Sequence, residues 1–144
     1  MTTIRALTAA AGALCFFAGG VAHAQGVTKT RILIGQSSPF SGSNKELGED
    51  IREGLQAYFK QVNDAGGVNG RTLELVALDD ANDAKRSAEN ARILIEQRGV
   101  LALIGYASAT LSLPALPFVE KGKVAFVGPF TGAEPMRSFR RNVY

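Results

Sequence analysis

Strand-like and helix-like segments alternate along the chain after residue 30, and few folds accommodate that order. Apolar runs typical of buried strands span residues 31–36, 72–78, 100–105 and 124–127, with stretches of helical length between them. Because strands joined by such crossovers pair in parallel, the order predicts an α/β fold: a doubly wound parallel sheet of four strands with helices on both faces. In sheets of this kind, ligands bind beyond the carboxyl ends of the strands, where the strand order reverses.

The segments between the predicted strands carry signals for where helices begin and end. Ser43-Asn44-Lys45-Glu46 has the spacing of a capping box, and Gly66-Gly67-Val68-Asn69-Gly70 ends the helix that follows it. Asp83 is expected to cap a second helix, since the acidic run before it lacks the Gly and Glu of a calcium loop. A third helix is expected over residues 111–121, with Pro117 kinking or delaying it. The predicted apolar stripe of the first helix consists of Leu47, Ile51, Leu55, Tyr58 and Val62.

Residues 1–24 have the features of a secretory signal peptide. Arg5 precedes an apolar run rich in Ala, Gly, Leu and Phe, and Ala22 and Ala24 are the small residues that precede a cleavage site. We therefore expect export to the periplasm and cleavage after Ala24. A membrane anchor is the alternative, but the run is shorter than the roughly 20 strongly apolar residues that a span needs.

Removal of this segment restricts the available chemistry, because it contains the only Cys and the only His of the chain, Cys15 and His23. A mature chain that begins at Gln25 has no thiol nucleophile, no imidazole base and no ordinary set of zinc ligands. We therefore expect neither a catalytic triad nor a metal site. Hydroxyl, amine and carboxyl groups remain, but the usual general base near neutral pH is missing.

The distribution of charge argues against nucleic acid as a partner. The formal net charge is +3, but much of the excess lies near the ends of the chain, where Arg137, Arg140 and Arg141 cluster. Outside residues 1–24 and 134–144 the chain carries 12 basic and 12 acidic side chains. A surface that binds nucleic acid needs clustered Lys and Arg opposite the phosphates.

Three loops rich in Ser, Thr and Gly follow predicted strands, at residues 37–42, 106–110 and 128–133. Hydroxyls and free backbone N–H groups at a helix N-terminus hold small anions such as carboxylates, but they do not supply an acid and a base together. Nucleotide binding is the main competing interpretation. The first loop lacks the G-x-G-x-x-G spacing, and the chain contains no G-x-x-x-x-G-K-[ST] motif. No cofactor is therefore predicted.

Several short stretches in combination carry a family resemblance: Ile32-Leu33-Ile34-Gly35 with Ser41-Gly42, Gly66-Gly67-Val68-Asn69-Gly70-Arg71, Leu78-Asp79-Asp80 with Asp83, Leu103-Ile104-Gly105, and Val127-Gly128-Pro129. Together they resemble the start of leucine/isoleucine/valine-binding-type solute receptors. Such receptors are periplasmic, have the type I periplasmic binding fold and deliver solutes to an ABC permease in the membrane. The resemblance implies a non-catalytic function, the binding of a branched-chain amino acid or a similar small carboxylate or amide.

The resemblance also implies a binding site on the second and third loops. Hydroxyls and N–H groups at the start of the third helix are expected to hold a ligand carboxylate, and the loop after the fourth strand to contact the ligand amine. Ala109 departs from the family pattern, which often has a hydroxyl there, and Ser108 or Thr110 is expected to compensate. Tyr106 either stacks on the ligand or packs at the end of the sheet. The expected ligand-binding residues are Tyr106, Ser108, Ala109, Thr110, Pro129, Phe130, Thr131 and Gly132.

Receptors of this family resemble two-lobed clamshells of more than twice this length, so we expect residues 25–144 to be an incomplete N-terminal lobe. The strand at residues 124–127 is then expected to have an exposed edge, which favours association with other chains. Two alternatives remain open. One is a small flavodoxin-like enzyme or nucleotide-binding module, and the other is a ligand-sensing regulatory domain of the same fold.

Overall fold

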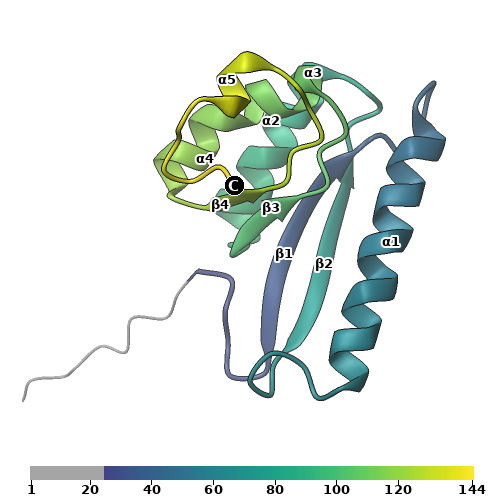
Figure 1. The fold of residues 1–144 in the computed structure, drawn as a ribbon, viewed down its shortest axis with the longest axis vertical. Helices are drawn as coiled ribbons and strands as arrows, with labels where there is room; N and C mark the ends of the chain where they lie inside the picture. Colours follow the sequence, from purple (N-terminus) through teal and green to yellow (C-terminus); the bar gives the residue numbers. More distant parts are fainter. Residues whose placement is uncertain (1–24) are drawn as a thin grey trace, which may run out of the picture.

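The computed structural model describes residues 25–144, so the predicted signal peptide and its cleavage after Ala24 lie outside the described residues. Four parallel strands form one sheet: β1 (Arg31–Ser38), β2 (Thr72–Asp79), β3 (Ala102–Ile104) and β4 (Ala125–Val127). Their order across the sheet is β2-β1-β3-β4, and it reverses between β1 and β3 (Figure 1). The predicted parallel α/β architecture is confirmed.

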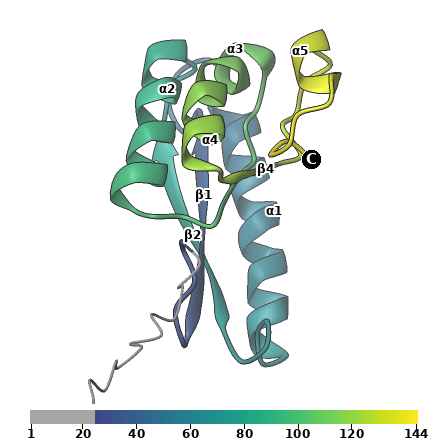
Figure 2. The same ribbon diagram turned by 90° about the vertical axis from the view of Figure 1, so that its left-hand side faces the viewer.

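Helices lie on both faces of the sheet, as predicted (Figure 1 and Figure 2). On one face, α1 (Lys45–Asp64) places Ile51 and Leu55 beside Gly105 at the end of β3. A short helix that the sequence does not predict, α5 (Glu134–Arg137), follows β4. No helix among residues 25–144 is long and apolar enough to cross a membrane. The other face carries α2 (Ala84–Arg92), a π-helical turn (Ile93–Gln97), α3 (Ala109–Ser112), a 3-10 turn (Leu113–Ala115) and α4 (Leu116–Gly122).

The main core lies between the sheet and the helices of this second face. Leu94 of the π-helical turn, Leu103 of β3 and Phe126 of β4 have no exposed surface. Leu111 of α3 and Val119 of α4 join the same cluster and are equally buried. Since β3 is covered on both faces, its sequence is apolar without alternation.

Helix α1 differs from the prediction at its start and along its buried face. Asn44 precedes the helix and its side chain makes no capping hydrogen bond, so the predicted capping box is wrong. Leu47 is 39% exposed and Tyr58 is 62% exposed. One residue turns the chain by about 100° around an α-helix, so Gly48 and Phe59 are buried while the residue before each of them is exposed. Gly48 lies against the backbone of Pro39, in the loop after β1. The apolar and glycine positions that are buried or half-buried are Gly48, Ile51, Leu55, Phe59 and Val62.

The predicted stop after α1 is confirmed in its backbone geometry. Gly66, directly after the helix, has a φ of 100°. Val68 and Arg71 then exchange both backbone hydrogen bonds, at 2.8 and 3.1 Å, across Asn69 and Gly70. These two central residues have φ values of 52° and 75°, which is the left-handed geometry of a type I′ turn, for which Asn-Gly is preferred. The turn directs the chain from α1 into β2.

Two other predicted helix boundaries are confirmed. Asp83 caps α2, since its carboxylate accepts the Arg86 N–H at 2.8 Å. The third helical stretch passes through the 3-10 turn that contains Pro114, and Pro117 then lies in the first turn of α4. Prolines have no N–H to donate, so the regular α-helix is delayed as predicted.

The outer edge of β4 is paired, so the predicted exposed edge strand is wrong. The Phe126 N–H donates to the Asn142 carbonyl at 2.7 Å, and the Tyr144 N–H donates to the Phe126 carbonyl at 2.9 Å. Val143 lies parallel to Phe126 in this pairing. The chain returns beside β4 after α5 (Figure 1), and backbone groups at this edge thereby find partners.

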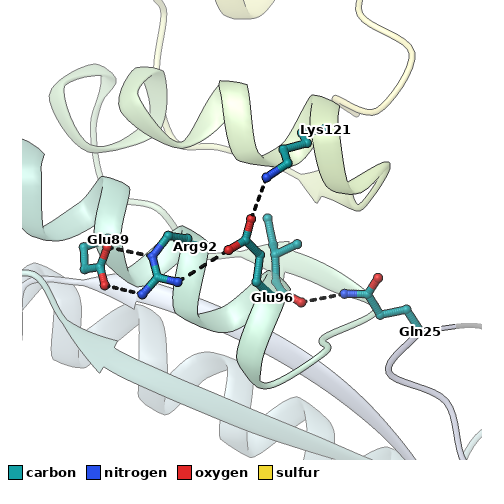
Figure 3. A network of polar contacts seen from close by, with 6 residues as sticks. Gln25, Glu89, Arg92, Glu96 and Lys121 are labelled. Carbon is teal, nitrogen blue, oxygen red and sulfur yellow. Dashed lines mark hydrogen bonds and ion pairs between the residues drawn. The ribbon is translucent and has the colours of Figure 1, made fainter.

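A network of ion pairs joins α2, the π-helical turn and α4 on the outer surface of the second face (Figure 3). Arg92 contacts Glu89 at 2.6 Å and Glu96 at 3.4 Å, and Lys121 contacts Glu96 at 3.0 Å. The bond with Arg92 lowers the pKa of Glu89, and the bond with Lys121 lowers the pKa of Glu96. Gln25 donates to a carbonyl of the π-helical turn at 2.6 Å. Because exposed ion pairs contribute little to stability, we expect this network mainly to orient α4.

Candidate functional site

Two of the candidate loops lie at the carboxyl ends of β3 and β4 and are joined by a hydrogen bond. The Phe130 N–H, in the loop after β4, donates to the Tyr106 carbonyl, in the loop after β3, at 2.9 Å. We call residues 106–110 and 128–133 the rim loops. The first of them follows β3, one of the two strands between which the strand order reverses, which is where doubly wound sheets bind ligands. The first candidate loop is shorter than predicted, because Ser37 and Ser38 still belong to β1.

The first rim loop leads into a helix N-terminus. Ser108 has extended backbone geometry, and its Oγ accepts the Leu111 N–H at 3.3 Å as the N-cap of α3. Ala109 is half-buried and Thr110 is exposed. The first N–H groups of a helix have no partner within it, so this segment offers hydroxyl and amide donors together. That is the chemistry predicted for holding a carboxylate.

The second rim loop surrounds an open hollow of about 480 Å³. Phe130 is 68% exposed beside it. The Thr131 Oγ1 accepts the Ala133 N–H at 3.1 Å, which orders the loop. The structure therefore brings the predicted residues of this loop to one hollow, while the predicted residues of the first rim loop lie outside its lining. The hollow is lined by Gly128, Pro129, Phe130, Thr131 and Gly132.

The ring of Tyr106 lies in the core and not at the rim. It has no exposed surface and meets the Phe126 ring edge-on, with the ring centroids 4.8 Å apart. Burial raises the pKa of Tyr106, and the nearby charge of Asp80 raises it further. The structure supports the second interpretation of Tyr106, packing at the end of the sheet. The first interpretation is wrong, because the buried ring has no exposed surface to stack on a ligand. Its backbone carbonyl accepts the Phe130 N–H of the second rim loop.

A buried polar group lies behind the rim loops, formed by residues to which the sequence analysis assigned no function. Asp80 has no exposed surface, and its carboxylate accepts the Ser37 hydroxyl at 2.8 Å and the Asn82 N–H at 3.0 Å. Burial raises the pKa of Asp80 despite these hydrogen bonds, and the charges of Asp79 and Asp83 act in the same direction. The one sequence signal for this group was the Asp-Asp pair of the family resemblance.

Hydrogen bonds to the Asp79 carboxylate connect the loop after β1 to the end of β2. Its carboxylate accepts the Phe40 N–H at 2.8 Å, the Ser41 hydroxyl at 2.6 Å and the Ala81 N–H at 2.8 Å. Burial acts in the opposite direction, but these hydrogen bonds lower the pKa of Asp79. Arg52 of α1 lies 4.4 Å from the centre of the Phe40 ring. The loop is therefore held from β2 and from α1.

The side chains that face the rim suit binding. Thr110 and Thr131 offer hydroxyls, Phe130 offers an exposed aromatic face, and the loop backbones offer N–H groups. Among residues 25–144, no cluster of three or more His, Cys, Asp or Glu side chains is placed to hold a metal ion. Hydroxyl and amide donors beside an apolar surface can hold a small molecule that has a polar end and an apolar end.

Comparisons with known proteins agree with one another. A family model described as periplasmic binding protein matches residues 31–144. A Leu/Ile/Val-binding protein homologue from Brucella abortus is 31% identical over 121 residues, which cover 80% of this chain and 32% of that protein. These matches favour the solute-receptor interpretation over the flavodoxin-like alternative.

Solved structures share the fold. A possible leucine/isoleucine/valine-binding protein from Rhodopirellula baltica matches with a TM-score of 0.72 at 31% identity, covering 81% of this chain and 31% of that one. A leucine-binding protein from Thermotoga maritima matches with a TM-score of 0.71 at 28% identity, covering 78% of this chain and 31% of that one. The chain spans about a third of the length of these relatives.

Proposed function

The chain belongs to the periplasmic binding protein family, and we propose that it is a non-catalytic solute-binding subunit of an ABC importer. The proposed solute is a branched-chain amino acid or a similar small carboxylate or amide, in keeping with the names of its relatives. The observation that carries the proposal is the hydrogen bond between Phe130 and Tyr106, which holds the two donor-rich rim loops side by side.

Each rim loop has its own proposed function. Ser108, Ala109 and Thr110 hold the solute carboxylate through hydroxyl and N–H donors at the start of α3. The hollow of the second rim loop receives the amine end and the apolar side chain, with Thr131 as a polar contact and Phe130 as an apolar one. Pro129 and Gly132 shape this hollow and offer backbone groups.

The wider setting of the chain is also a proposal. Residues 25–144 supply part of the first lobe of a two-lobed receptor, since the chain spans about a third of its relatives. A second lobe would close over the rim loops and exclude water, which strengthens polar contacts. The family implies the periplasm as the location and an ABC permease as the partner, with export and cleavage after Ala24 as the route.

Titration of the ¹⁵N-labelled chain, followed by NMR, tests the proposal. Branched-chain amino acids, their amides and small carboxylates are added to high concentration, because one lobe encloses a solute incompletely. We expect shifts confined to the resonances of residues 106–110 and 128–133. Shifts elsewhere, or none for any compound in the panel, would contradict the proposed function, and copurified flavin or turnover of a substrate would favour an enzyme.

A pair of threonine variants separates specific binding from general surface effects. Thr110→Val removes a hydroxyl from the first rim loop, and Thr72→Val removes one from the opposite end of the sheet. Loss of one hydrogen bond costs about 1 kcal/mol, so Thr110→Val is expected to weaken binding about fivefold. Thr72→Val is expected to leave the affinity unchanged.

A further inference from the structure

Strand β2 lies at one edge of the sheet, and alternate residues along it direct their backbone groups outward. In a parallel pair, the N–H and C=O of one residue point to the same side. The N–H groups of Thr72 and Asp80 donate toward β1, to Thr30 and Ser38. The residues whose backbone groups point away from β1 are therefore Leu73, Leu75, Ala77 and Asp79. Such an edge is a template for pairing with another chain.

The outward backbone groups of Leu73, the first of these residues, form hydrogen bonds with a side chain from α1. The Asn63 Oδ1 accepts the Leu73 N–H at 2.7 Å, and the Asn63 Nδ2 donates to the Leu73 carbonyl at 2.9 Å. One side-chain amide thus satisfies both backbone groups of a single residue, as a neighbouring strand would do.

The last outward residue is contacted by a second asparagine, which comes from the opposite face of the sheet. The Asn90 Nδ2 of α2 donates to the Asp79 carbonyl at 3.1 Å and to the Ser37 hydroxyl at 3.1 Å. Within residues 25–144, no hydrogen-bond partner is found for the outward backbone groups of Leu75 and Ala77. The free edge is therefore reduced to these two central residues and the N–H of Asp79.

We propose that Asn63 and Asn90 protect the β2 edge: their side chains occupy its backbone groups and prevent β2 from pairing with the same strand of a second copy of this chain. The few free backbone groups form too few hydrogen bonds for a second strand to be added. Without the two asparagine side chains, β2 presents an edge of ordinary strand length. Lys60, which is paired with Asp64 at 2.6 Å, lines the groove beside Leu73 and Leu75, so a charged pair also lies near this edge.

The experiment compares the double variant Asn63→Ala/Asn90→Ala with Ser87→Ala. Ser87 also donates a buried side-chain hydrogen bond, to the Leu111 carbonyl at 2.8 Å, but it lies away from the β2 edge. Sedimentation velocity over a concentration series measures association at a temperature where circular dichroism shows each variant folded. The double variant is expected to self-associate about tenfold more tightly than the parent chain or more, while Ser87→Ala is expected to match the parent.

Adding Ala77→Pro to the double variant gives the decisive result. The Ala77 N–H points outward, so proline removes no hydrogen bond of the sheet but blocks strand pairing. We expect it to reverse the association without restoring stability. The proposal is overturned if the asparagine variants stay as monomeric as the parent, if Ser87→Ala associates equally, or if Ala77→Pro changes nothing. If the double variant does not fold, the single variants are measured in the same way, with Asn63→Ala expected to associate more strongly.

Discussion

Tyr106 carries a buried hydroxyl at the junction between the core and the rim loops. This hydroxyl lies near Ser37, but among the described residues it makes no hydrogen bond of normal geometry, while the ring packs against Phe126. Removing an unpaired buried hydroxyl relieves a desolvation cost, so Tyr106→Phe is expected to raise the free energy of unfolding by up to about 1 kcal/mol or leave it unchanged. Urea unfolding measures this. Tyr106→Ala, which removes the ring, is expected to lose about 3–5 kcal/mol. A clear loss of stability in Tyr106→Phe would show that the hydroxyl has a partner.

The two neighbouring aspartates at the end of β2 make opposite contributions to stability as the pH changes. The folded-state pKa of Asp80 is raised above its ordinary value of 3.8, so ionisation of Asp80 reduces stability as the pH rises through and above that value. The folded-state pKa of Asp79 is lowered, so its contribution is complete above 3.8 and is lost as the pH falls through the folded value.

Substitution by asparagine separates these two contributions. Asp80→Asn is expected to remove a loss of stability on going from acidic to neutral pH, and Asp79→Asn to remove a gain over the same interval. Urea unfolding across a pH series gives the difference between each variant and the parent chain. If both variants change the pH profile in the same direction, the assigned pKa shifts are wrong.

At the scale of single elements, α1 contains two glycines with opposite surroundings. A Cβ added at Gly48 would lie 1.8 Å from the Pro39 carbonyl oxygen, whereas a Cβ at Gly54 would meet nothing within 4 Å. Gly54→Ala is therefore expected to stabilise the chain by about 0.5–1 kcal/mol, since alanine favours a helix over glycine. Gly48→Ala is expected to destabilise it by about 1–3 kcal/mol, because α1 must move away from the loop after β1.

Thermal or urea unfolding of both glycine variants checks this prediction. Helix propensity alone would make the two alanine substitutions equivalent, so equal effects would show that the close approach to Pro39 is not required. The opposite signs follow from tertiary contact. The same cause explains why Leu47 is exposed while its neighbour Gly48 is buried.

The limits of the elements also depended on more than local sequence. Ser37 and Ser38 have the composition of a turn, yet both pair with β2, opposite Leu78 and Asp79. Pairing along a neighbouring strand overrides the weak local preference of serine. The sequence therefore predicted the four strands, the helical stretches between them and their order, but not α5. It was less accurate about where β1, β3 and β4 begin and end.

At the scale of the whole molecule, the two outer strands of the sheet are protected in different ways. Strand β4 is paired by backbone groups of Asn142 and Tyr144, and β2 is contacted by the side chains of Asn63 and Asn90. Because residues 142–144 already pair with this edge, the structure does not support the predicted association of chains through β4. Association through β2 instead depends on two side chains, which the asparagine variants test.

The sequence alone determined the fold class, the end of α1 and the cap of α2, because these follow from the periodicity of apolar residues and from the backbone preferences of Gly, Asn and Asp. The residues of the candidate site came from a family resemblance, and the structure brought the two rim loops together. Tertiary structure decided that the ring of Tyr106 lies in the core, that residues 142–144 pair with β4, and that Asn63 and Asn90 contact β2. These contacts join residues from different elements, and local periodicity does not report which backbone groups or rings will meet when separate elements pack.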